Sequence, residues 1–172
     1  MEVVYLGNSD EYSDVVMPET FDPRHLGFHR QVCQEAGELE SVAHGVHPDL
    51  PDSVSAVLLR FRSASWLLDV DLDDDTVQVS EPASADPELV FSDASSTGLW
   101  APALGRPVLW AWILENQQGH TDGLQLSFAL DGGAEWRVQL IAAASQWRLS
   151  GWGPPESEAS GEYDQGSQRH SA

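Results

Sequence analysis

Apolar and polar residues alternate along several short segments of this chain, most clearly between Pro107 and Trp152. A period of two indicates β-strands, because successive side chains of a strand point to opposite faces of a sheet. Asp131-Gly132-Gly133 interrupts the block and predicts a hairpin turn, since glycine adopts positive φ at little cost. In the first segment of the block both faces are apolar, which is typical of a central strand covered on two sides. We expect four strands here, at 108–114, 124–130, 136–140 and 146–152.

The preceding part of the chain also contains strand patterns. Residues 54–61 form an apolar, β-branched run, and in 66–72 the side chains of Trp66, Leu68 and Val70 share one face, opposite Leu67 and Asp69. With a return strand at 76–80 these segments predict an antiparallel meander. Residues 38–46 fit either a helix or a strand, and we favour a strand because Gly37 and Gly45 weaken a helix. A Pro- and Ser-rich connection follows at 81–106, with one short helix or turn at 87–93.

These patterns predict the fold class. No regular alternation of strands and helices is present, so a parallel sheet is not expected. The sequence predicts a mainly β, single-domain protein, with an α+β fold as the alternative. We expect a bent antiparallel sheet or a partly closed barrel, with at most one or two short helices. The predicted organisation is a loop-rich segment at 1–30 with a short edge strand at 3–6, a β domain at 31–152 and a disordered acidic tail at 153–172.

The charge balance is the compositional feature that most restricts the possible partners. The chain has 28 acidic residues against 8 arginines, has no lysine, and carries a formal net charge of -20. Such a charge repels nucleic-acid phosphates and anionic lipids, so neither is expected as a partner. It favours a basic protein as the partner, and a soluble acidic protein without such a partner is the alternative.

The single cysteine, the N-terminal sequence and the lengths of the apolar runs indicate the cellular compartment to expect. Cys33 excludes a disulfide within the chain and favours a reducing compartment. An acidic N-terminus does not resemble a signal peptide, and no apolar run reaches the ~20 residues of a membrane span. We therefore expect a cytoplasmic protein. No cofactor motif is present, and no cofactor is expected.

The acidic hairpin is the first candidate for a binding surface. Asp69 and Asp71 occupy alternate strand positions about 7 Å apart, and an acidic turn follows them. Carboxylates grouped in this way can form a contact patch for a cationic partner or hold Ca²⁺ or Mg²⁺, although the glycine and the final glutamate of a calcium loop are missing. A solvated strand face with an acidic turn is the alternative. The candidate residues are Asp69, Asp71, Asp73, Asp74 and Asp75.

A polar loop at 116–123 is the second candidate. His120 and Asp122 are two residues apart and could form an acid–base pair, because histidine titrates near neutral pH. The alternative is that the aspartate accepts backbone hydrogen bonds and shapes the turn. No catalytic or metal-ligating residue is assigned, and the binding candidates are Asn116, Gln117, Gln118, His120 and Asp122.

Tryptophans are the third group of candidates. Trp110, Trp112, Trp136 and Trp147 occupy alternating positions and are expected in the core. Trp100 and Trp152 lie at the ends of predicted elements, where one or both could be exposed anchors for a partner.

Two stretches resemble a family of uncharacterised small bacterial proteins. These are GRPVLWAWILENQQGHTDGLQLSF, with a Trp-containing strand before an Asn-Gln-Gln-Gly turn, and the upstream hairpin SWLLDVDLDDDTVQV. The resemblance covers about residues 38–150, and this chain has His120 where the family pattern has an aromatic residue. No activity is implied, but by analogy small acidic proteins of this type include toxin-neutralising immunity proteins.

Three functional hypotheses follow. The first is a non-enzymatic acidic binding protein, in its finer form an immunity protein that neutralises a basic toxin. The second is a small metal-dependent or acid–base enzyme that uses His120 with Asp122, or the acidic hairpin. The third is a structural or adaptor subunit anchored by Trp100 and Trp152.

Overall fold

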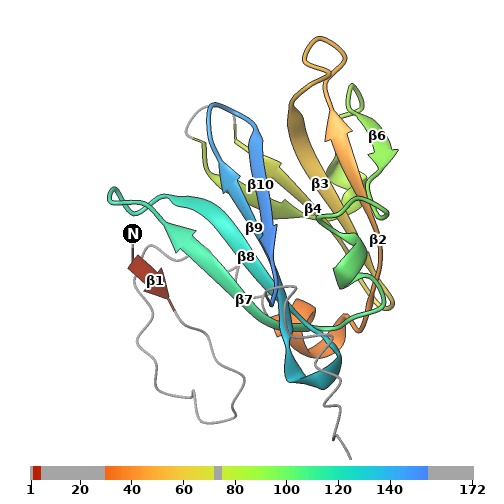
Figure 1. Ribbon diagram of the computed structural model, residues 1–172. Helices are drawn as coiled ribbons and strands as arrows, with labels where there is room; N and C mark the ends of the chain where they lie inside the picture. The colour runs from red at the N-terminus through yellow and green to blue at the C-terminus, as the bar shows by residue number, and fades with distance from the viewer. Residues whose placement is uncertain (1, 5–29, 72–74, 155–172) are drawn as a thin grey trace, which may run out of the picture.

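The computed structural model describes residues 2–4, 30–71 and 75–154, which form two five-stranded antiparallel sheets (Figure 1). Sheet I has the order β1-β7-β8-β9-β10, and sheet II has the order β5-β4-β3-β2-β6. The strands of sheet I are β1 (Glu2–Val4), β7 (Val108–Glu115), β8 (Thr121–Ala129), β9 (Glu135–Ala142) and β10 (Trp147–Trp152). Those of sheet II are β2 (Leu39–Val46), β3 (Val54–Phe61), β4 (Ser65–Val70), β5 (Val77–Ser80) and β6 (Val90–Asp93).

In the described ranges, four short helical segments lie between the strands. They are the π-helix η1 (Gln31–Glu35) and the 3₁₀ turns η2 (Pro82–Ser84), η3 (Ala101–Ala103) and η4 (Asp131–Gly133). The expected hairpin turn at 131–133 is confirmed, and both of its glycines have positive φ. Residues 87–93 form a turn and then β6, which pairs with β2, so the helix considered there is replaced by an edge strand.

The expectation of a mainly β, antiparallel fold is confirmed. The strands are divided between two sheets, because the connection from β6 to β7 carries the chain from one sheet to the other. The short edge strand expected near residue 3 is also present, since β1 pairs with the edge of β7. No helix in the described ranges is long and apolar enough to cross a bilayer.

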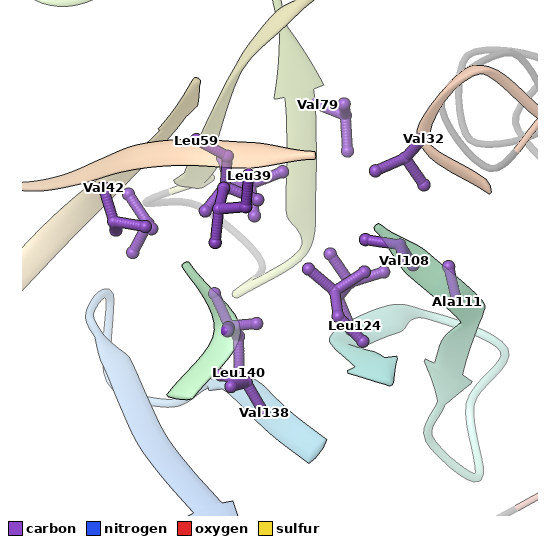
Figure 2. Packing of buried hydrophobic residues seen from close by; sticks show 14 of the residues in the cluster. Val32, Leu39, Val42, Leu59, Val79, Val108, Ala111, Leu124, Val138 and Leu140 are labelled. Carbon is purple, nitrogen blue, oxygen red and sulfur yellow. The ribbon is translucent and has the colours of Figure 1, made fainter. Parts of the chain in front are cut away.

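The main core lies between the two sheets. Figure 2 shows Val42 and Leu59 of sheet II and Leu124 and Leu140 of sheet I contributing to it, with Val32 from η1 at one side. Each of these side chains is at most 2% exposed. Burial of apolar surface from both sheets is the dominant stabilising contribution in such a sandwich.

A β-bulge reverses the orientation expected for two tryptophans. The register of β7 against β8 shifts between Val108 and Trp110, so one residue is inserted into the strand. Val108, Ala111 and Ile113 therefore join the core, whereas Trp110 and Trp112 lie on the opposite face of sheet I and are only partly buried. The prediction that both belong to the core is wrong, because one inserted residue reverses the side chains of a strand.

The other two tryptophans of this group behave as expected. Trp147 belongs to the core, and Trp136 packs against it. Both indole N–H groups donate to backbone carbonyls, Trp147 to Leu68 of sheet II and Trp136 to Leu99. The two rings therefore tie sheet I to sheet II and to the long connection before β7.

Candidate functional site

The acidic hairpin does not form one uniform patch. Its described members occupy three different environments, and Asp73 and Asp74 lie outside the described residues. Asp71 accepts a hydrogen bond from the side-chain amide of Gln78 at 2.7 Å, which holds it against the neighbouring strand. The alternation predicted for β4 is confirmed, since Trp66, Leu68 and Val70 pack against the core, opposite Leu67.

Asp75 joins the two sheets. Its carboxylate accepts hydrogen bonds from the backbone N–H groups of Ser145 at 2.6 Å and Ala144 at 3.2 Å, both in the turn between β9 and β10. Asp75, Ala144 and Ser145 all have positive φ. This backbone conformation is unfavourable for residues other than glycine, asparagine and aspartate. The charged acceptor therefore stabilises a turn that local conformational preferences disfavour.

Asp69 is the unusual carboxylate of the hairpin. Its side chain is half-buried on the outer face of sheet II, where its cross-strand neighbours are Ala56 and Gln78. The Oδ1 atom is buried and accepts no hydrogen bond within the described part of the chain. Burial raises the pKa of Asp69, a hydrogen bond from its own backbone N–H to the carboxylate opposes the shift, and the negative charge of Asp71 adds to it. A buried acceptor without a donor is costly, so this oxygen is a feature that the local structure has to account for.

A pocket of about 590 Å³ lies against Asp69, at the end of the sandwich where several connections meet. The β2–β3 hairpin, the end of β4, the segment before β6 and the β9–β10 turn contribute its walls. Among the residues that line it are His47, Leu50, Asp69, Val70, Asp86 and Leu89.

Further carboxylates lie in the connections that line the pocket. Asp49 and Asp52 belong to the β2–β3 hairpin, and Glu88 follows Asp86 in the segment before β6. The Glu88 carboxylate lies 3.1 Å from Nε2 of His47, within hydrogen-bonding distance. We call the described carboxylates of this region the acidic end; they are Asp49, Asp52, Asp69, Asp71, Asp75, Asp86 and Glu88.

Sequence reasoning identified only the β4–β5 part of the acidic end. It missed Asp49, Asp52, Asp86, Glu88 and the pocket. One local signal was present. His-Pro-Asp at 47–49 and Asp-Pro-Glu at 86–88 are both turn sequences with a carboxylate next to a proline. That the two turns meet is decided by the pairing of β2 with both β3 and β6.

The predicted polar loop forms a second hollow, of about 390 Å³, lined by Asn116, Gln117, Gln118 and Asp122. The Asn116 side chain accepts hydrogen bonds from the backbone N–H groups of Gln118 and His120, so it organises the turn. Burial raises the pKa of Asp122, whose Oδ1 accepts no hydrogen bond from the described residues. His120 therefore does not donate to this oxygen.

Trp100 is not an exposed anchor, and that prediction is wrong. Its side chain is 0% exposed and belongs to the core, because the connection that carries it folds back under the edge of sheet II. Its indole N–H donates to Nε2 of His44 at 2.9 Å, and burial lowers the pKa of this histidine. Trp152, at the end of β10, is 40% exposed, so its role as an anchor stays a prediction.

The structure also gives the environment of the single cysteine. Burial raises the pKa of the Cys33 thiol to about 11, while a backbone hydrogen bond from Ala111 opposes the shift. Within the described ranges, no group of three or more His, Cys, Asp or Glu side chains is arranged to hold a metal ion.

Cys33 is expected to react slowly with iodoacetamide. The thiolate is the reactive species, and its fraction at pH 8 falls about 100-fold when the thiol pKa rises from 9.0 to about 11. The rate should increase with pH through pH 10 and reach that of the unfolded chain in denaturant. Mass spectrometry of the alkylated fraction over time measures this, and a native rate at pH 8 equal to the denatured rate would contradict it.

A comparison with protein families completes the description of the site. The model of a family of unknown function, DUF6334, matches residues 17–154. The chain belongs to this family. The match includes both sheets from β2 to β10, the acidic end and the loop at 116–123. No curated protein and no solved structure shows a significant match to the chain.

Proposed function

We propose that this DUF6334 protein is a non-enzymatic acidic binding protein that recognises a basic protein through its acidic end. The observation that carries the proposal is the separation of charge along the sandwich. Carboxylates from the connections of sheet II gather at one end, around a pocket, and the ion pairs of the described arginines lie elsewhere.

The positions of those ion pairs support the proposal. Four arginines of the described ranges pair with carboxylates, and the pairs involve η1, the start of β2, the η4 turn and the start of β9. Figure 1 shows η1 and η4 at the end of the sandwich opposite the β2–β3 and β9–β10 turns. The pairs are Arg30–Glu35, Arg62–Glu38, Arg106–Asp131 and Arg137–Glu135.

None of the carboxylates of the acidic end forms one of these arginine pairs. Like charges held together repel one another, and a cationic partner relieves that repulsion when it binds. Such a surface also accelerates association with a basic protein and makes the association sensitive to salt. Neutralisation of a basic toxin is the finer form of this proposal, supported by the analogy with acidic immunity proteins.

Binding to a basic peptide tests the proposal. We expect a fluorescently labelled, arginine-rich peptide to bind the full chain at low ionic strength, and a matched acidic peptide not to bind. Replacing Asp49 and Asp52 by asparagine and Glu88 by glutamine should weaken binding roughly ten-fold and reduce its salt dependence. Fluorescence anisotropy at several salt concentrations provides both values.

A matched variant separates local from overall charge. Replacing Glu40, Glu81 and Glu115 by glutamine changes the net charge by the same amount but leaves the acidic end intact. This variant should bind within about two-fold of the natural chain, since screened charges beyond about 10 Å contribute little. Equal losses in the two variants, or no binding of the basic peptide to the natural chain, would refute the proposal.

A further inference from the structure

The pocket at the acidic end combines an apolar floor with carboxylates. Leu50, Val70 and Leu89 contribute apolar surface, and Asp69 and Asp86 contribute negative charge. Apolar pockets with a few converging polar groups are the usual form of a site for a side chain or a small molecule. The volume of about 590 Å³ exceeds what a single bound water requires.

The hydrogen-bonding groups of the pocket are unequally occupied. Oδ1 of Asp86 already accepts the backbone N–H of Glu88, and the His47 ring is bonded to the Glu88 carboxylate. Oδ1 of Asp69, in contrast, is buried and accepts no hydrogen bond from any described residue. The nearby Gln78 amide, which could have donated to it, donates to Asp71 instead. Asp69 thus contributes a carboxylate to the lining, and the described lining residues include no arginine.

We infer that the pocket binds the side chain of an arginine from the basic partner, with Asp69 accepting hydrogen bonds from its guanidinium group. This inference rests on the proposed function and names the group that the acidic end recognises. The methylene groups of the arginine would contact Leu50, Val70 and Leu89, while its planar head faces Asp69.

Arginine fits this pocket better than lysine for two physical reasons. A guanidinium group presents several N–H donors in one plane and can bond both oxygens of a carboxylate, whereas an ammonium acts as a single charged point. The guanidinium is also more weakly hydrated, so moving it onto an apolar floor costs less free energy. The hydroxyl groups of Ser53 and Ser55, which also line the pocket, offer further acceptors for its remaining donors.

The other hollow is a weaker candidate for the same role. The loop at 116–123 also contains a buried carboxylate oxygen without a donor, that of Asp122. Its other lining residues, Asn116, Gln117 and Gln118, are neutral and polar, and it lacks both the apolar floor and a second carboxylate.

Two matched peptides and two matched variants test the inference. The peptides have the same sequence except that all basic residues are arginine in one and lysine in the other. The variants are Asp69→Asn, in the pocket, and Asp49→Asn, whose side chain is 89% exposed on the same acidic end. Both variants remove one negative charge. Only Asp69→Asn removes that charge from inside the pocket.

We expect the natural chain to bind the arginine peptide roughly ten-fold more tightly than the lysine peptide. Asp69→Asn should abolish this preference and weaken arginine-peptide binding roughly ten-fold. Asp49→Asn removes a charge of the acidic end outside the pocket, so it should weaken binding of both peptides equally, and by less than Asp69→Asn weakens arginine-peptide binding. The backbone amide signals of Val70 and Leu89 should shift in NMR spectra when the arginine peptide is added. Asp69→Asn should not melt at a lower temperature, since it replaces a carboxylate whose ionised form is disfavoured by burial.

Three results would overturn the inference in distinguishable ways. If Asp69→Asn and Asp49→Asn bind the arginine peptide equally well, the pocket is excluded as the arginine site. The proposed function would stand in that case. Equal affinities of the natural chain for both peptides would exclude an arginine site. Failure of the natural chain to bind either peptide would reject the proposed function and, with it, the inference.

Discussion

Replacing Trp100 by alanine is expected to reduce the free energy of unfolding by about 3–5 kcal/mol, close to the limit of what a domain of this size tolerates. The ring is 0% exposed and lies in the main core. Its removal leaves a cavity that the surrounding β-sheets cannot fill, because strands in two hydrogen-bonded sheets relax only in part. The change also removes the donor that satisfies Nε2 of the half-buried His44.

Urea unfolding followed by circular dichroism measures this loss without relying on tryptophan fluorescence. Trp100→Phe separates the two contributions, since it retains most of the buried volume but lacks the N–H donor. We expect it to lose about 1–3 kcal/mol. Trp152→Ala is the matched control, because that ring is 40% exposed, and it should cost less than about 1 kcal/mol. Equal losses for Trp100→Ala and Trp152→Ala would show that Trp100 is not part of the core.

Replacing Asp75 by alanine is expected to destabilise the chain by about 2–3 kcal/mol. The change removes the acceptor for the N–H groups of Ala144 and Ser145, and it places alanine at a φ of 57°. Aspartate and asparagine tolerate this conformation better than alanine does. The β9–β10 turn would then lose its connection to the β4–β5 hairpin, although the core would remain.

Hydrogen exchange tests this prediction at the residues concerned. The amides of Ala144 and Ser145 should lose protection in Asp75→Ala, while amides in the centre of β8 remain protected. Asp75→Asn provides the control, since asparagine tolerates positive φ and retains one oxygen acceptor, so it should lose about half as much stability. Unchanged protection at both amides in Asp75→Ala would contradict the role assigned to the carboxylate.

The same variant bears on the pocket. Ala144 and Ser145 form part of its wall, and Asp75 holds them in place. Asp75→Ala is therefore expected to weaken arginine-peptide binding, because the pocket wall would lose the carboxylate that holds it in place. This connects the stability of the inter-sheet contact with the shape of the proposed binding site.

The candidate site was predicted from the sequence only in part. Asp69 and Asp75 were identified as members of an acidic hairpin. The sequence did not predict that Asp69 is half-buried or that Asp75 forms a contact between the two sheets. His47, Asp86 and Leu89 were not identified, because they lie in two separate polar connections, His47 between β2 and β3 and the other two just before β6. Nothing local in those connections indicates that they meet around one pocket.

The sequence by itself determined the strand segments other than β6, the 131–133 turn, the antiparallel mainly β class and the acidity of the chain. These properties depend on the period-two alternation, on glycine at a turn and on residue counts, all of which are local or additive. The tertiary structure alone decided the division into two sheets, the orientation of Trp110 and Trp112, the burial of Trp100 and the assembly of the pocket. The bulge in β7 reverses a face by inserting one residue, and the other features depend on which distant segments pair, so alternation along the chain does not specify them.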